Sequence, residues 1–123
     1  MTDKTRIGFR TVGQVTVADI QAGELTAEAA EQLQGKVREL SEAGSGVRLV
    51  LDLSGVRFMN SVALGMLVVL LRRVRAAEGQ LALAGLSGHA LRILQVTGLE
   101  KVFNLHDNVD RAVEELAGKE NRV

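Results

Sequence analysis

Asn60 and Ser61 stand where a short connecting segment meets the most apolar stretch of the chain. A side-chain oxygen at a helix start can accept a hydrogen bond from a free backbone N–H, which stabilises the helix by about 1 kcal/mol. The same place suits a phosphate, because free N–H groups and the helix dipole both stabilise an anion. The two residues therefore support two compatible interpretations. In the first, the side chain of Asn60 or of Ser61 caps the helix. In the second, the Ser61 hydroxyl is a candidate phosphate acceptor.

Apolar side chains flank this serine in the sequence: Phe58, Met59, Val62 and Met66. Phosphorylation would add about −1.5 to −2 charges beside them. Such a charge would switch off an apolar docking surface through repulsion and desolvation. A plain role in the core stays open for each of these side chains, since phenylalanine and methionine are residue types that are usually buried.

The other residues that could do chemistry do not form a recognisable active site. We interpret His89 and His106 as surface or cap residues, because a metal centre or a catalytic triad needs more converging partners. Asp52 and Asp107 lie near expected strand ends, where turn or cap roles are common. The chain has no cysteine and no glycine-rich phosphate-binding or nucleophile motif. It is therefore predicted not to be an enzyme, and to need no metal or cofactor.

Composition narrows the class of partner. The 123 residues are 46% hydrophobic and 24% charged, with a net charge of zero, which fits one globular domain over residues 1–123. A neutral chain with 2% aromatic residues argues against direct nucleic-acid binding. The longest apolar run, Val62–Leu71, is shorter than the ~20 residues of a membrane span. We expect a cytoplasmic protein with no membrane attachment.

Apolar periodicity predicts the elements that position Ser61. Their order, β-β-α-β-α-β-α-β-α, indicates a single α/β domain with a mixed, mostly parallel sheet of about five strands and about four helices. The core is expected over residues 7–117, with a flexible tail over 118–123. The expected strands are Ile7–Arg10, Gln14–Ile20, Val47–Leu53, Gln80–Ala84 and Lys101–Leu105, and the helices run from Thr26 to about Ala43, Val62–Ala77, Gly88–Thr97 and Asn108–Ala117.

An ordered set of motifs along residues 7–117 resembles the STAS domain family, the bacterial anti-sigma-factor antagonists. The resemblance implies a single-domain STAS-like fold. The motifs are Gly23-Glu24-Leu25, Leu49-Val50-Leu51-Asp52-Leu53 with Ser54-Gly55-Val56, Phe58-Met59-Asn60-Ser61 with Leu64-Gly65, Gly79-Gln80-Leu81-Ala82-Leu83, Leu94 with Thr97-Gly98-Leu99, and Val102-Phe103.

The switch motif of the family reads Met-Asp-Ser-Ser-Gly-Leu-Gly, and its phosphorylated serine falls on Ser61. This chain departs from the motif at the preceding acidic residue, which is Asn60, and at the second serine and the glycine, which are Val62 and Ala63. Thr26 replaces the aspartate that commonly follows Gly-Glu-Leu. The neutral residues at positions 26 and 60 each remove one negative charge from the rim of the switch.

The resemblance implies a partner-switching role in transcription regulation. The unphosphorylated protein, a monomer or weak dimer, would bind an anti-sigma factor that is often also a serine kinase. Phosphorylation of Ser61 would break the complex, and a metal-dependent serine phosphatase would reset it. The implied docking residues are Phe58, Met59, Asn60, Val62 and Met66, with Gly23 and Glu24 on an adjacent loop. The alternative is a constitutive STAS scaffold, or an accessory subunit of a signalling or transport complex, without phospho-switching.

Overall fold

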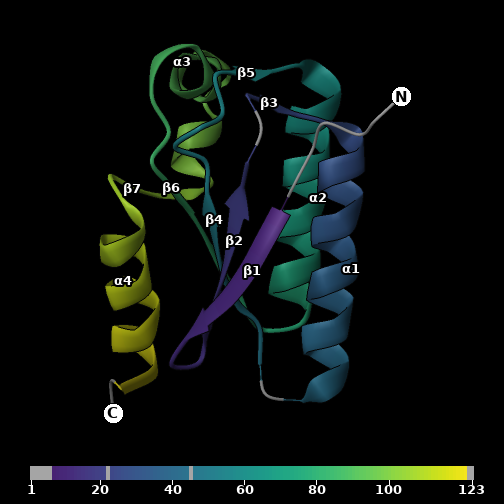
Figure 1. The fold of residues 1–123 in the computed structure, drawn as a ribbon, viewed down its shortest axis with the longest axis vertical. Helices are drawn as coiled ribbons and strands as arrows, with labels where there is room; N and C mark the ends of the chain where they lie inside the picture. Colours follow the sequence, from purple (N-terminus) through teal and green to yellow (C-terminus); the bar gives the residue numbers. More distant parts are fainter. Residues whose placement is uncertain (1–6, 22, 45, 122–123) are drawn as a thin grey trace.

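A five-stranded sheet with helices on both faces organises the chain (Figure 1). The computed structural model describes residues 7–21, 23–44 and 46–121. The strand order is β1-β2-β4-β6-β7, with β1 antiparallel to β2 and every other neighbouring pair parallel. The predicted mixed, mostly parallel sheet is therefore confirmed. Its strands are β1 (Ile7–Val12), β2 (Val15–Ile20), β4 (Arg48–Asp52), β6 (Gln80–Ala84) and β7 (Asn104–His106).

A hairpin joins β1 and β2. Strand β1 continues two residues beyond the expected strand Ile7–Arg10, whereas β2 begins at Val15, one residue later than expected. Val12 pairs with Val15, so the loop consists of only Gly13 and Gln14. Gly13 has a φ of 64°, in the left-handed region that glycine adopts without strain. A glycine at the first position of a two-residue loop is typical of a type II′ turn, which matches the twist of the strands.

Four helices cover the two faces of the sheet, as predicted in number and order. The central strand β4 shows why its sequence is almost entirely apolar. Leu49 and Leu51 pack in the larger core with side chains from α1, α2 and α3, whereas Val50 packs under α4. Both faces of β4 are thus buried, as expected for a central parallel strand. The helices are α1 (Ala27–Ala43), α2 (Ser61–Ala76), α3 (Gly88–Thr97) and α4 (Val109–Asn121).

The last strand was predicted too early in the chain. A short 3₁₀ helix, η1 (Leu99–Lys101), occupies the start of the expected strand Lys101–Leu105, and β7 begins only at Asn104. The Leu99 carbonyl accepts hydrogen bonds from the N–H groups of Val102 and Phe103. These bonds wind the chain through one more turn before it can pair with β6.

The final helix is longer than predicted. It continues through residues 118–121, the start of the expected tail 118–123, and residues 122–123 lie outside the described part of the chain. Gly118 follows the last residue of the expected helix Asn108–Ala117. A glycine inside a helix costs only about 1 kcal/mol relative to alanine, so it does not by itself stop one.

A second, two-stranded sheet was not predicted from the sequence. Its parallel strands are β3 (Glu24–Leu25) and β5 (Phe58–Met59), and they pair Glu24 with Phe58 and Leu25 with Met59. β3 directly precedes α1, and β5 directly precedes α2. The small sheet therefore ties together the starts of the two helices on the same side of the main sheet.

Candidate functional site

Gly23 and Glu24 lie directly beside the segment that precedes Ser61, but Glu24 belongs to strand β3 and not to a loop. The Gly23 carbonyl accepts hydrogen bonds from the N–H groups of Arg57 at 2.6 Å and Phe58 at 3.1 Å. These two bonds and the β3–β5 pairing fix the backbone just before α2. Residues that are more than thirty positions apart in the chain thus form one surface.

The capping role at the start of α2 belongs to Asn60. Its Oδ1 accepts a hydrogen bond from the Ala63 N–H at 2.8 Å, and its backbone is extended, with φ −86° and ψ 176°. Ser61 is the first residue of the helix, and its side chain is exposed. The Ser61 hydroxyl makes no hydrogen bond with any residue that the structure describes. Of the two residues that could have capped the helix, Asn60 does so and Ser61 does not.

Removing this cap should destabilise the domain measurably. We expect Asn60→Ala to lower the free energy of unfolding by about 1 kcal/mol, because the Ala63 N–H loses its partner. Urea denaturation followed by far-ultraviolet circular dichroism measures the change. Asn60→Asp is the matched control, since it keeps the accepting oxygen and adds a charge that suits the helix dipole. Equal stability of Asn60→Ala and the wild type would contradict the capping role.

The apolar residues around Ser61 separate into surface and core. Phe58 and Val62 are 58% and 59% exposed, and Met66 is half-buried one turn further along α2. Met59, by contrast, is only 3% exposed and packs in the larger core. Met59 is therefore a core residue, the alternative that its residue type left open, and it is not part of the exposed surface. Successive side chains of an extended strand point to opposite sides. Phe58 therefore lies on the exposed side of β5, and Met59 lies on the side that faces the core.

Helix α3 adds a residue to this surface. The His89 ring packs against the Phe58 ring, with centroids 5.7 Å apart and planes tilted by 53°. His89 is exposed, as predicted for a surface residue, but its contact with Phe58 was not predicted. Thirty-one positions separate the two residues in the chain, and no local pattern links them. The exposed surface thus runs from the start of α2 through Phe58 to the start of α3.

A hollow of about 530 Å³ opens beside the Phe58 ring. It lies at the carboxyl ends of β2 and β4, the edge of a parallel sheet where ligands commonly bind. Gly23 and Phe58, both named in the sequence analysis, are part of its wall. The remaining lining residues are Asp19, Ile20, Gln21, Ser54, Gly55 and Arg57.

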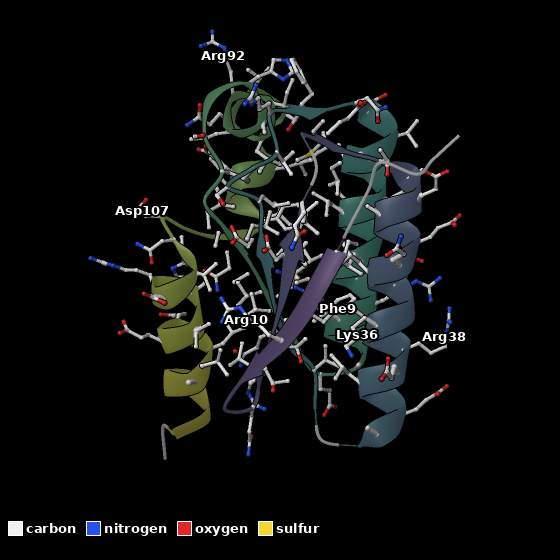
Figure 2. The ribbon with its side chains drawn as sticks, viewed as in Figure 1. Phe9, Arg10, Lys36, Arg38, Arg92 and Asp107 are labelled. Atoms are coloured by element: carbon white, nitrogen blue, oxygen red, sulfur yellow. The ribbon has the colours of Figure 1, made fainter. Side chains whose placement is uncertain are left out.

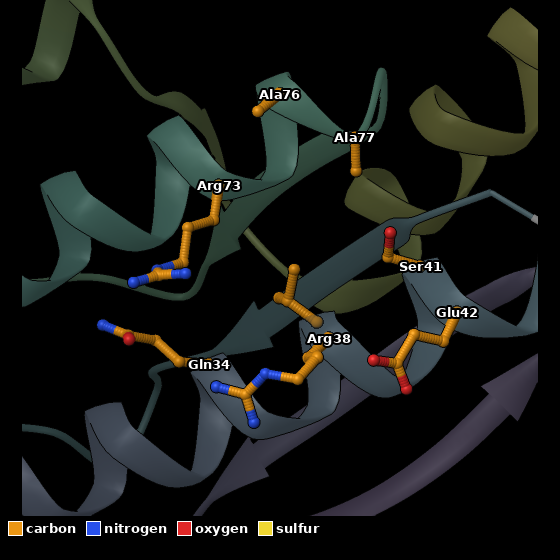
Figure 3. A pocket seen from close by; sticks show the side chains of 8 residues that line it. Gln34, Arg38, Ser41, Glu42, Arg73, Ala76 and Ala77 are labelled. Carbon is orange, nitrogen blue, oxygen red and sulfur yellow. The ribbon is translucent and has the colours of Figure 1, made fainter.

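Another hollow, of about 320 Å³, lies between α1 and α2 (Figure 3). Arg38 on α1 and Arg73 on α2 extend along it, and Gln34 points toward the Arg73 side chain. It is near the ends of both helices, about 18 Å along α2 from Ser61 at a rise of ~1.5 Å per residue. This hollow is therefore separate from the surface around the serine.

Two further findings concern the described residues, 7–21, 23–44 and 46–121. Among these residues, up to residue 117 for side chains, no three histidine, aspartate or glutamate side chains are grouped so that they could hold a metal ion. No helix in this part of the chain has the length and apolar character that crossing a membrane requires.

Comparison with known proteins matches residues 9–112 to the STAS domain model. The anti-sigma-B factor antagonist of Bacillus subtilis strain 168 is 33% identical over 90 residues, which cover 71% of this chain and 81% of that protein. The anti-sigma-B factor antagonist of Listeria monocytogenes is 31% identical over 84 residues, 68% and 73% of the two chains. A crystal structure of an anti-sigma factor antagonist from Mycobacterium paratuberculosis superposes with a TM-score of 0.75 at 23% identity, covering 93% of this chain and 95% of that one. The family match spans most of the chain, and the chain belongs to the STAS domain family.

Proposed function

We propose that this protein is an anti-sigma-factor antagonist that binds an anti-sigma factor through the surface around Ser61. The observation that carries the proposal is the exposed Ser61 at the first position of α2, with the exposed residues Phe58 and Val62 on either side of it in the sequence. Relatives that are 31% and 33% identical are named as antagonists of this kind. In this role the chain carries out no reaction of its own.

The docking surface that we propose consists of Phe58, Asn60, Ser61, Val62 and Met66, with Gly23 and Glu24 beside them. Exposed apolar side chains at its centre supply the contact area that a protein partner buries. The hollow beside Phe58 is large enough to receive a side chain of that partner. The anti-sigma factor would therefore meet an apolar patch with a small concavity next to it.

Phosphorylation of Ser61 would turn this surface off without unfolding the domain. The first turn of α2 contains no acidic residue, so no nearby carboxylate on the helix repels a phosphate there. The positive end of the helix dipole stabilises the added charge in the free protein. In the complex, the same charge would have to lose its water between Phe58 and Val62, which disfavours binding. We propose the anti-sigma factor as the serine kinase, and a serine phosphatase as the enzyme that restores the hydroxyl.

Intact-mass analysis after incubation with source-cell extract and ATP, followed by affinity measurement with the captured anti-sigma factor, tests this proposal. We expect one added phosphoryl group in the wild type and none in Ser61→Ala. Ser61→Asp should weaken binding at least about tenfold, the effect of ~1.4 kcal/mol. Ser61→Ala should bind within about threefold of the wild type, because the hydroxyl makes no hydrogen bond within the described chain.

Ser41→Asp is the matched control for the added charge. Ser41 is exposed near the far end of α1, so this variant should bind like the wild type. A stable complex with no phosphorylation would instead support the constitutive scaffold or accessory-subunit role. Failure of the unphosphorylated wild type to bind any anti-sigma factor would overturn the proposed function.

A further inference from the structure

Strand β1 forms an open edge of the main sheet (Figure 1). It is six residues long, whereas β7 at the opposite edge has only three. Its pairing with β2 runs without a bulge from Ile7–Ile20 to Val12–Val15. Natural proteins usually protect such edges with proline, bulges, several charges or very short strands. β1 has one charged residue, Arg10, and none of the other devices.

The pairing register identifies which backbone groups face outward. Val12 and Val15 flank a two-residue turn, so they form a hydrogen-bonded pair, and such pairs alternate along an antiparallel ladder. Residues 8, 10 and 12 therefore direct their N–H and C=O groups toward β2. Ile7, Phe9 and Thr11 direct theirs away from it. In the described part of the chain, no strand pairs with this outer side of β1.

The side chains at this edge are also suited to a contact. Phe9 pairs with Ala18, a residue of the larger core, so its ring lies on the α1 side of the sheet. The Lys36 ammonium of α1 sits 5.0 Å from the centre of this ring (Figure 2), and the Glu39 carboxylate lies 3.6 Å from the same ammonium. Phe9 remains 38% exposed, so part of an aromatic ring is presented beside the open backbone edge.

We propose that two copies of this chain pair through β1, antiparallel about a two-fold axis, to form one continuous ten-stranded sheet. In this register Phe9 faces Phe9 of the second copy, Ile7 faces Thr11, and Gly8 faces Arg10. All the outward backbone N–H and C=O groups of residues 7, 9 and 11 then form hydrogen bonds with the second copy. Each copy donates three N–H groups and accepts at three C=O groups, which makes six hydrogen bonds across the axis.

A second copy fits this edge because the register is self-complementary. The only charged residue of β1, Arg10, faces a glycine and not another cation. The two Phe9 rings meet at the axis, where an aromatic pair is favourable. The chain is neutral overall, so the two copies do not repel one another at long range. No residue of the docking surface around Ser61 belongs to β1, and the dimer would therefore carry two such surfaces.

Position 9 offers a direct test, because it faces itself across the axis. Analytical ultracentrifugation of the wild type over a range of concentrations should show a monomer–dimer equilibrium. Phe9→Glu and Phe9→Lys should each raise the dissociation constant at least about tenfold, since each places like charges opposite one another. An equimolar mixture of the two variants should recover dimer, because unlike charges then meet. Circular dichroism establishes that both variants are folded.

Val69→Glu is the matched control, because Val69 is 39% exposed but lies on α2. It should dimerise like the wild type. The proposal is overturned if the wild type stays monomeric up to about 1 mM, a concentration at which even weak association is detected. It is also overturned if both Phe9 variants dimerise like the wild type, or if their mixture stays as monomeric as either variant alone. The anti-sigma-factor binding described above does not enter this measurement, so the two proposals can fail separately.

Discussion

Replacing Met59 with alanine is expected to lower the free energy of unfolding by about 2–5 kcal/mol. The Met59 side chain is buried in the larger core, and its backbone pairs with Leu25, which is fully buried. Alanine would leave a cavity at the point where β3, β5 and the starts of two helices are joined. Urea denaturation followed by far-ultraviolet circular dichroism gives the change. A loss below about 0.5 kcal/mol, the usual range for surface positions, would show that Met59 is not a core residue.

Replacing the neighbouring Phe58 with alanine should have the opposite profile. Its largely exposed ring contributes little to the core, so the free energy of unfolding should change by less than about 1.5 kcal/mol, mainly through the lost ring contact with His89. Affinity for the anti-sigma factor should fall about 30-fold or more, corresponding to ~2 kcal/mol for an aromatic residue at the centre of an interface. Isothermal titration calorimetry measures this loss.

Val102→Ala serves as the control for Phe58→Ala. Val102 is an exposed apolar residue after η1, outside the proposed docking surface, so its replacement should leave the affinity unchanged. If Phe58→Ala binds as tightly as the wild type while remaining folded, Phe58 is not part of the interface. The variants at positions 58 and 59 are thus expected to change different quantities. Phe58→Ala should lower mainly the affinity for the anti-sigma factor, and Met59→Ala mainly the free energy of unfolding.

The main sheet and the helix start at Ser61 could be predicted because local patterns determine them. The near-continuous apolar run over Val47–Leu53 indicates a strand covered on both faces, and β4 is such a strand. A polar pair before a long apolar stretch indicates a helix start, and α2 begins at Ser61. These signals depend on neighbours within one element, so a single sequence contains them.

The parts that escaped prediction depend on residues distant in the chain. Strand β5 is only two residues long. An alternation of apolar and polar residues, which would indicate the buried face of a strand, cannot be seen in so short a segment. Only its pairing with β3 reveals that Met59 lies in the core. Gly79 is a further example. A Cβ on this residue would collide with the Val47 carbonyl oxygen and lie 2.7 Å from the Val47 Cβ, so the close approach of two chain segments requires glycine there.

The two hydrogen bonds to the Gly23 carbonyl have a consequence for how complexes form. Immobilising a flexible segment on association costs about 1–2 kcal/mol per residue in backbone entropy. Arg57 and Phe58 are already held by these bonds, and Met59 anchors the next position in the core. The segment of the proposed docking surface is thus ordered before any partner binds, and more of the contact energy would be available as affinity. The backbone entropy of this segment is lost when the domain folds, so association with a partner would not have to supply that free energy again.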